Sequence, residues 1–316
     1  MTNGLRLGML GGANIARQFK GDVKPNDYEA MLANPEINAV YIPLPNSLHA
    51  QWAIKAAEHG KRILCEKPLA LNCAEAESMF DAADKHDVML LEAFPYYFQP
   101  QTAAMMTLIG EGAIGSVRSM QASFGFTVGK PGTNIPPEAG TGRRRAARCR
   151  QLHAELHSPR DLVMGTAPQS VQAVATWADS NVDISLMATL LYADGRHAQF
   201  SCAIDGANHR MATIVGTDGT IDTEFLNHTS DEAKGDAYGY LPSQLRVRRG
   251  IANTIPFEQV ESQTGSGFFF AAESFARMVK SHDEAAIAYY AQTSLDNAAT
   301  LSAIIESARR GRLVAL

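Results

Sequence analysis

The stretch LRLGMLGGANIA, residues 5–16, decides the fold of this chain. Residues 5–10 are mostly apolar and predict a short strand, the glycines at 11–12 predict a tight turn, and Asn14 begins a predicted helix. A glycine turn that leads into a helix leaves backbone N–H groups free to bind a pyrophosphate. The stretch therefore indicates a dinucleotide-binding βα unit, and the alternative is an ordinary strand-to-helix turn.

The glycine pattern departs from the full dinucleotide fingerprint. The three fingerprint positions are occupied by Gly11, Ala13 and Ala16. Alanine is compatible with the third position, whereas at the second position its Cβ limits how closely a diphosphate approaches the backbone. The pattern alone is a weak indication of a cofactor site.

A second apolar strand, followed by polar residues, lies in AVYIPLPNSLH, residues 39–49. Residues 39–42 predict the strand, two prolines end it, and a helix is predicted from about 47 to 59. Asn46 and His49 then stand near the carboxyl edge of the sheet, where open α/β sheets bind their ligands. The alternatives are that Asn46 is a helix cap and that His49 is a surface residue of the first helical turn.

A third strand carries the strongest candidate for chemistry, in RILCEKP, residues 62–68. Ile63 to Cys65 predict a short buried strand, and Glu66, Lys67 and a proline follow it. A lysine delivered to the carboxyl edge of the sheet can donate a proton or hold a substrate hydroxyl group. An exposed, solvated Glu-Lys pair is the alternative interpretation of these two charges.

Taken together, these segments resemble the glucose–fructose oxidoreductase, inositol dehydrogenase and rhizopine catabolism (Gfo/Idh/MocA) family. The similar text is LGMLGGANIA, then YIPLPNSLHAQWAIKAAEHGKRILCEKPLAL, then LLEAFPYYFQPQ, and it resumes from DLVMG to the C-terminal SLDNAATLSAIIESARRGRLVAL. The resemblance implies a nicotinamide-binding Rossmann domain, and a C-terminal domain with a large open sheet. It also implies hydride transfer at a carbinol or carbonyl carbon, and it is strongest to the aldose and trans-dihydrodiol dehydrogenase branch.

The resemblance also implies site residues. Lys67 is the catalytic lysine, and the cofactor is NAD or NADP, which the sequence does not distinguish. The residues expected to bind the cofactor are Gly11, Gly12, Ala13, Asn14, Ile15, Pro43, Leu44, Asn46, His49, Glu66, Lys67 and Pro68. Tyr96 and Tyr97 follow the EAF segment and are expected to face the substrate, with a core or lid role as the alternative. No metal site is expected.

Composition limits the classes of protein to consider. The chain has 316 residues, of which 46% are hydrophobic and 19% charged, as expected for a globular protein with two domains. Its net charge of −5 gives no general attraction to nucleic acid. The four cysteines lack C-x-x-C spacing, which argues against a zinc site and for a reducing compartment. We find no targeting or membrane-spanning stretch and expect a cytoplasmic enzyme.

The second half of the chain is rich in predicted strands. Strands are expected at 116–127, 170–178, 182–192 and 197–204, with turns at 194–195 and 217–220, and helices at about 267–280 and 289–309. The predicted fold is α/β, with a Rossmann-like parallel sheet in residues 1–95. Residues 96–316 are expected to form an α+β domain on a large open, mostly antiparallel sheet. One face of that sheet is expected to pair subunits into a homodimer or homotetramer.

One departure from the family lies after the first helix. A doubly wound domain needs a second strand that ends in an acidic residue about 20 positions past the glycines. Here the first helix runs to about Lys20, and residues 21–27 lead directly to the segment 28–32 that precedes the next strand. The second strand and its helix are therefore expected to be missing, which leaves the ribose contact unassigned and the first strand with an unpaired edge.

The other departure is a cluster of five arginines among the eight residues 143–150. The segment is a solvated basic stretch, a phosphate or nucleic-acid patch, or a family motif read out of frame. No aromatic residue is interleaved, which weakens the nucleic-acid interpretation. Shifting the frame of residues 142–153 by one nucleotide permits GGGALLDAGSY, which resembles the glycine-rich active-site segment of the family. We favour this third interpretation.

The departures leave two functional hypotheses. The family's active-site Asp falls at Arg148 and its Tyr or His at Leu152. Neither replacement serves as a general acid or base, because arginine stays protonated near neutral pH and leucine has no proton to give. The chain is an oxidoreductase with impaired activity, or it is a non-catalytic pseudoenzyme or sugar- or nucleotide-binding protein on the same scaffold. A small-molecule substrate is expected, with no nucleic-acid or membrane partner.

Overall fold

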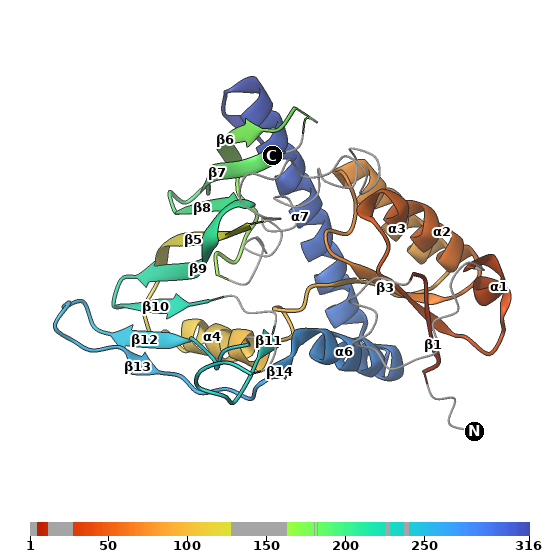
Figure 1. Ribbon diagram of the computed structural model, residues 1–316, viewed down its shortest axis with the longest axis horizontal. Coiled ribbons are helices and arrows are strands. Elements are labelled where there is room, and N and C mark those ends of the chain that lie inside the picture. Colours follow the sequence, from red (N-terminus) through yellow and green to blue (C-terminus); the bar gives the residue numbers. More distant parts are fainter. Residues whose placement is uncertain are drawn as a thin grey trace. The chain divides into compact units, whose positions relative to one another are not determined.

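The computed structural model describes residues 5–11, 28–127, 163–179, 181, 183–224, 228–236 and 240–316. The predicted site residues Gly12, Ala13, Asn14 and Ile15 and the arginine-rich segment 143–150 lie outside the described residues. The chain divides into unit 1, residues 1–94 with 268–298, and unit 2, residues 95–267 with 299–316. Each unit contains one large sheet (Figure 1). The sequence analysis assigned the segment 268–298 to the C-terminal domain.

Unit 1 is built on a four-stranded parallel sheet in the order β1-β2-β3-β4. The strands are β1 (Leu7–Met9), β2 (Ala39–Ile42), β3 (Arg62–Glu66) and β4 (Leu90–Ala93). Every residue of β2 and β4 is buried, as expected for strands covered on both faces. The predicted strands at 5–10, 39–42 and 63–65 are confirmed, and their carboxyl ends meet at one edge of the sheet.

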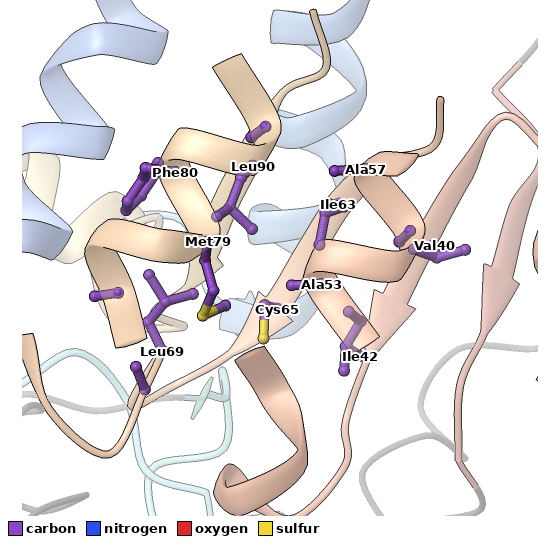
Figure 2. Close-up of a cluster of buried hydrophobic side chains, with 14 of the residues drawn as sticks. Val40, Ile42, Ala53, Ala57, Ile63, Cys65, Leu69, Met79, Phe80 and Leu90 are labelled. Atoms are coloured by element: carbon purple, nitrogen blue, oxygen red, sulfur yellow. The ribbon is translucent and has the colours of Figure 1, made fainter. Parts of the chain in front are cut away.

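Helices cover this sheet and fill its core. They are α1 (Tyr28–Ala33), α2 (His49–Glu58), α3 (Cys73–Lys85), α6 (Gly267–Ser281) and the first part of α7 (Glu284–Arg310). Most core side chains come from β2, β3, β4, α2 and α3 (Figure 2). Leu10, Leu32 of α1, Leu69, Ala70 and Ala298 of α7 complete the core. Met79 and Phe80 of α3 are its largest helical contributors. Helix α3 begins at a cap in which the Asn72 side chain accepts a hydrogen bond from the Glu75 N–H at 2.9 Å.

Strand β1 has one partner among the described residues, which is β2 on one side. No described strand lies along the other edge of β1, where a doubly wound fold places its second strand. Residues 12–27, in which that strand is expected to be missing, lie outside the described residues. The missing strand therefore stays a prediction.

Unit 2 is built on a nine-stranded sheet in the order β13-β12-β10-β9-β5-β8-β7-β6-β15. Its longer strands are β5 (Val117–Thr127), β6 (Ser170–Trp177), β7 (Asp183–Leu191), β8 (His197–Ala203), β9 (Asp205–Gly216), β10 (Gly219–Thr223) and β12 (Arg246–Arg249). The short edge strands are β13 (Glu258–Gln259) and β15 (Val314–Ala315), and β11 (His228–Thr229) pairs separately with β14 (Gly265–Ser266). The predicted open, mostly antiparallel sheet is confirmed, with β5 and β8 as a parallel pair.

The two predicted turns of unit 2 are confirmed. Asp194 and Gly195 connect β7 to β8 in an antiparallel hairpin, and Gly195 has a φ of +82°, which favours glycine. The turn around Asp218 connects β9 to β10. Helix α4 (Pro100–Gly110) and the end of α7 complete the unit, and the Ala173 N–H of β6 donates to the Ser307 hydroxyl of α7 at 2.9 Å.

Among the described residues, no helix is long and apolar enough to cross a membrane. No group of three or more His, Cys, Asp or Glu side chains in the same residues is placed to hold a metal ion.

Candidate functional site

The candidate site lies at the carboxyl edge of the parallel sheet of unit 1. Strand β3 ends at Glu66, and Lys67 follows directly, with only 8% of the lysine exposed. An ammonium group in so buried a position requires nearby negative charge. Glu66, next to it in the chain, supplies a carboxylate, and the carboxyl group of Glu92 lies on the neighbouring strand β4.

Glu66 is held by Tyr41 of β2. The Tyr41 hydroxyl donates a hydrogen bond to Glu66 Oε1 at 2.5 Å, and both residues are buried. Burial, with the Glu66 charge, raises the pKa of Tyr41, so the phenol keeps its proton and acts as a donor. Glu66 is thereby fixed in orientation beside Lys67.

Glu92 is the most deeply buried charged group of this edge, with 4% of the residue exposed. Its Oε1 accepts a hydrogen bond from the Leu69 N–H at 2.7 Å. Burial raises the pKa of Glu92 to about 8, and the charge of Glu66 adds to the rise, whereas Ser294, the Leu69 N–H and Lys67 oppose it. Ser294 of α7 faces the carboxyl group, although Oε2 has no hydrogen bond of normal geometry. Glu92 is therefore mostly neutral at pH 7.

His49 begins α2 and is fully buried, so the alternative of a surface residue is wrong. Its Nδ1 lies 3.2 Å from the Pro68 carbonyl oxygen and 3.1 Å from that of Leu69, and its Nε2 lies 2.8 Å from the Leu44 carbonyl oxygen. Burial lowers the pKa of His49, while the three carbonyls oppose this shift because each favours a protonated ring nitrogen. The imidazole ties the loop after β2 to the loop after β3.

The loop after β2 also carries Asn46, which lies in the short 3-10 helix η2 (Asn46–Leu48). Its side chain is not a cap, because Leu48 is the N-cap of α2 and no side chain caps either helix. Asn46 is buried and its Nδ2 has no hydrogen-bond partner. A buried amide without a partner is costly in a finished structure, so it suits a position that a ligand completes.

Gly11 stands where β1 leads into the glycine turn. Its φ is +128°, and a Cβ built on it would lie 3.1 Å from Leu44 Cδ2. Any other residue would meet both backbone strain and this close contact. Gly11, Pro43 and Leu44 thus lie next to one another, as expected for residues of one cofactor site.

The two tyrosines expected at the substrate belong to unit 2. Their rings stack with centroids 5.1 Å apart. Tyr96 is almost fully buried, and its carbonyl oxygen accepts a hydrogen bond from the Thr102 hydroxyl at 2.5 Å. Tyr97 is half-buried. A substrate role for either residue stays a prediction.

Sequence reasoning did not single out Tyr41 or Glu92. Both occupy late positions of apolar strands whose carboxyl ends meet at the edge that carries Lys67. A lone carboxylate in the apolar text LLEAF was the available signal for Glu92. The resulting arrangement is one ammonium, one ionised carboxylate held by a phenol, and one neutral carboxyl group, which can place positive charge at a reacting oxygen.

Comparison with known proteins identifies relatives. The family described as "Oxidoreductase family, NAD-binding Rossmann fold" matches residues 10–94. D-xylose 1-dehydrogenase (NADP(+)) 2 of Haloferax volcanii is 30% identical over 292 residues, which cover 92% of this chain and 83% of that protein. Trans-1,2-dihydrobenzene-1,2-diol dehydrogenase of Danio rerio is 27% identical over 290 residues, covering 90% of this chain and 80% of that protein.

Solved structures share the fold. A 3-ketoreductase from Actinomadura kijaniata, in complex with TDP-benzene and NADP, aligns with a TM-score of 0.76 at 23% identity, covering 96% of this chain and 98% of that chain. Levoglucosan dehydrogenase in complex with NADH aligns with a TM-score of 0.75 at 22% identity, covering 99% and 90%. The chain therefore shares its fold with these solved structures.

Proposed function

Since this chain belongs to the Gfo/Idh/MocA family of NAD(P)-binding oxidoreductases, we propose that it transfers a hydride between a nicotinamide and a carbon of a sugar, cyclitol or cyclic diol. The observation that carries the proposal is Lys67, which is buried at the carboxyl edge of β3, next to Glu66 in the chain and close to the carboxyl group of Glu92. The cofactor is NAD or NADP. When bound, it supplies the hydride donor or acceptor at C4 of the nicotinamide ring.

The described part of unit 1 fits such a cofactor. Gly11 packs directly against Leu44, and the unpartnered Asn46 Nδ2 offers a donor at the same edge of the sheet. We assign Gly11, Pro43, Leu44, Asn46, Glu66, Lys67 and Pro68 to the walls of the cofactor site. His49 supports that wall from inside, through the carbonyl oxygens of Leu44, Pro68 and Leu69. Gly12, Ala13, Asn14 and Ile15 would extend the wall along the glycine turn.

Lys67 performs the protein's part in the chemistry. Its ammonium group stabilises negative charge on the substrate oxygen as the C–H bond forms or breaks, and it holds a proton at that oxygen. Glu66 keeps the ammonium oriented, because Tyr41 fixes the carboxylate. Since Glu92 is mostly neutral at pH 7, the positive charge of Lys67 is balanced by one carboxylate rather than two.

The substrate class follows the named activities of the relatives, which act on D-xylose and on trans-1,2-dihydrobenzene-1,2-diol. We propose Tyr96 and Tyr97 as residues that face it. The test is an assay of cofactor reduction with aldoses, cyclitols and cyclic diols, each with NAD and with NADP. Turnover with at least one member of the panel supports the proposal.

A non-catalytic binding protein is the second candidate, and the observation that favours it is in the sequence. Arg148 and Leu152 occupy the positions that correspond to the family's active-site Asp and its Tyr or His. We propose that these replacements lower turnover. Binding of a cofactor or sugar without any turnover across the whole panel would favour this candidate over the enzyme.

We also propose a homodimer or homotetramer that pairs through the exposed face of the unit 2 sheet. On this sheet, a row of side chains crosses β6, β7, β8, β5 and β9 in register. The row consists of Val174, Met187, Ser201, Ser123 and Met211. The valine and the two methionines of this row are 55%, 57% and 51% exposed. An apolar row across an open sheet is an unusual surface for a monomer, and a second copy of the same face would cover it.

The thiols of Cys65 and Cys73 support a cytoplasmic location. Cys65 is buried, Cys73 is half-buried, and neither of these two forms a disulfide. Proteins whose cysteines stay reduced and scattered are typical of reducing compartments. We propose that the protein works there on a small-molecule substrate.

A further inference from the structure

The buried carboxyl group of Glu92 has a cost that packing does not explain. Glu92 lies on β4 opposite Cys65 of β3, and only 4% of it is exposed. Burying a carboxyl group costs free energy, and an apolar side chain of similar size would avoid that cost. We therefore expect the Glu92 carboxyl group to have a role that offsets the free-energy cost of its burial.

Its hydrogen bond with the backbone supplies that role. Oε1 accepts from the Leu69 N–H at 2.7 Å, two residues after Lys67. On the other side of the same backbone, His49 Nδ1 lies within hydrogen-bond distance of the Pro68 and Leu69 carbonyl oxygens. The backbone that leaves Lys67 is thus contacted from two sides, by the Glu92 carboxyl group and by the His49 ring.

We propose that Glu92 is a positioning residue for Lys67, whose carboxyl group fixes the backbone behind the lysine and whose protonation state sets the charge beside the ammonium group. This inference rests on the proposed role of Lys67 in hydride transfer. Glu92 acts through Lys67 and its backbone, and it requires no contact with the substrate.

The groups that face Glu92 define how it responds to pH. They are Cys65, Glu66 and Lys67 from β3 and its end, the Leu69 N–H, and Ser294 of α7. Burial raises the pKa of Cys65 as well, so its thiol stays neutral, and Glu66 is the carboxylate already present. When Glu92 ionises near pH 8, a second negative charge appears beside Lys67 and lowers the positive potential at the reacting oxygen. Turnover should fall as pH rises through this point.

Three variants test the inference in the full chain. Glu92→Gln keeps an acceptor for the Leu69 N–H but cannot ionise, whereas Glu92→Met removes the acceptor at similar length. Lys61→Met is the matched control: Lys61 is also buried, and its Nζ donates to the carbonyls of Asn34 and Ile37 at 2.8 and 2.6 Å, away from residues 67–69. This variant removes a buried polar side chain of unit 1 without changing residues 67–69.

The first measurement needs no turnover. Hydrogen–deuterium exchange of the Leu69 amide should speed up about 10-fold or more in Glu92→Met, and stay near the parent rate in Glu92→Gln and Lys61→Met. Equal protection of this amide in Glu92→Met and the parent would overturn the positioning role. Because exchange is independent of the reaction, failure of the positioning role is distinguished from failure of the proposed function.

The second measurement follows the ionisation of the Glu92 carboxyl group. A carbon NMR signal of a glutamate side chain, absent from Glu92→Gln, should titrate near pH 8. In steady-state assays Glu92→Met should lose about 10- to 100-fold in kcat with little change in cofactor KM, while Lys61→Met retains kcat. Glu92→Gln should keep kcat at pH 7 and lose the fall near pH 8. An alkaline fall that persists unchanged in Glu92→Gln would overturn the second part of the proposal, as would a Glu92 signal that titrates in the ordinary acidic range.

Discussion

Replacement of Glu92 by glutamine should change the pH dependence of unfolding in a defined direction. In the folded protein the pKa of Glu92 is about 8, and its ordinary value is 4.5. Between these two values the folded protein keeps a proton that the unfolded chain releases. The parent therefore loses stability as pH rises through this range, and the loss is complete above about pH 8. Glu92→Gln has no proton to lose and should be free of this effect.

The size of the effect follows from the same two values. Each pKa unit of difference between the folded and unfolded states corresponds to about 1.4 kcal/mol. Between about pH 5 and pH 9, the free energy of unfolding of the parent should fall by about 4 kcal/mol relative to that of Glu92→Gln. This is a large part of the 5–15 kcal/mol or so that stabilises a typical domain.

Urea unfolding of both proteins in steps of pH, followed by tryptophan fluorescence, gives the two stability curves. Their difference removes the contribution of every other titrating group that the two proteins share. Replacing the exposed Glu111 by glutamine controls for the loss of one glutamate. Curves of parent and Glu92→Gln that run parallel over the whole range would refute the argument, because Glu92 would then ionise alike in the folded and unfolded chains.

Three further outcomes are expected. His49→Phe should lose about 3 kcal/mol of unfolding free energy in urea titrations, because the buried carbonyl groups of Leu44, Pro68 and Leu69 lose their polar contacts with the ring. A loss under about 0.5 kcal/mol would contradict this. Met187→Lys should lower the particle mass in light scattering, because it places a charge on the exposed sheet face; a monomeric parent would contradict the pairing proposal. The parent should bind NAD(H) and NADP(H) weakly in fluorescence titrations. Replacing residues 142–152 with GGGALLDAGSY should tighten cofactor binding and raise turnover. Tight binding by the parent would contradict this expectation, because it would show that another segment has taken over the ribose contacts.

Sequence reasoning predicted the strands and the position of Lys67 for a simple physical reason. Apolar runs such as residues 39–42 and 63–65 form buried strands, and parallel strands deliver the residues that follow them to one edge. Glu66 and Lys67 were therefore predictable at this edge. The burial of Glu66 and Lys67 was not predictable, because it depends on the side chains of neighbouring strands and loops that pack around them.

The contacts that hold the backbone after Lys67 join residues far apart in the sequence, so no local sequence pattern predicts them. Glu92 and Leu69 are 23 residues apart, and they meet only because β3 and β4 pair in one particular register. His49 was placed correctly at the start of a helix, but the sequence did not show that its ring points inward. Likewise, the apolar spacing of α6 predicted a buried face without showing that this helix belongs to unit 1.

The measurement that tests the account most directly is single-turnover hydride transfer in parent, Lys67→Met and Lys61→Met. Reduced nicotinamide is followed at saturating cofactor with a sugar or cyclic diol. The account predicts turnover in the parent and in Lys61→Met, and a loss of about 100- to 1,000-fold in Lys67→Met. Equal rates in the parent and Lys67→Met would contradict the central claim, as would cofactor binding with no turnover in any of the three.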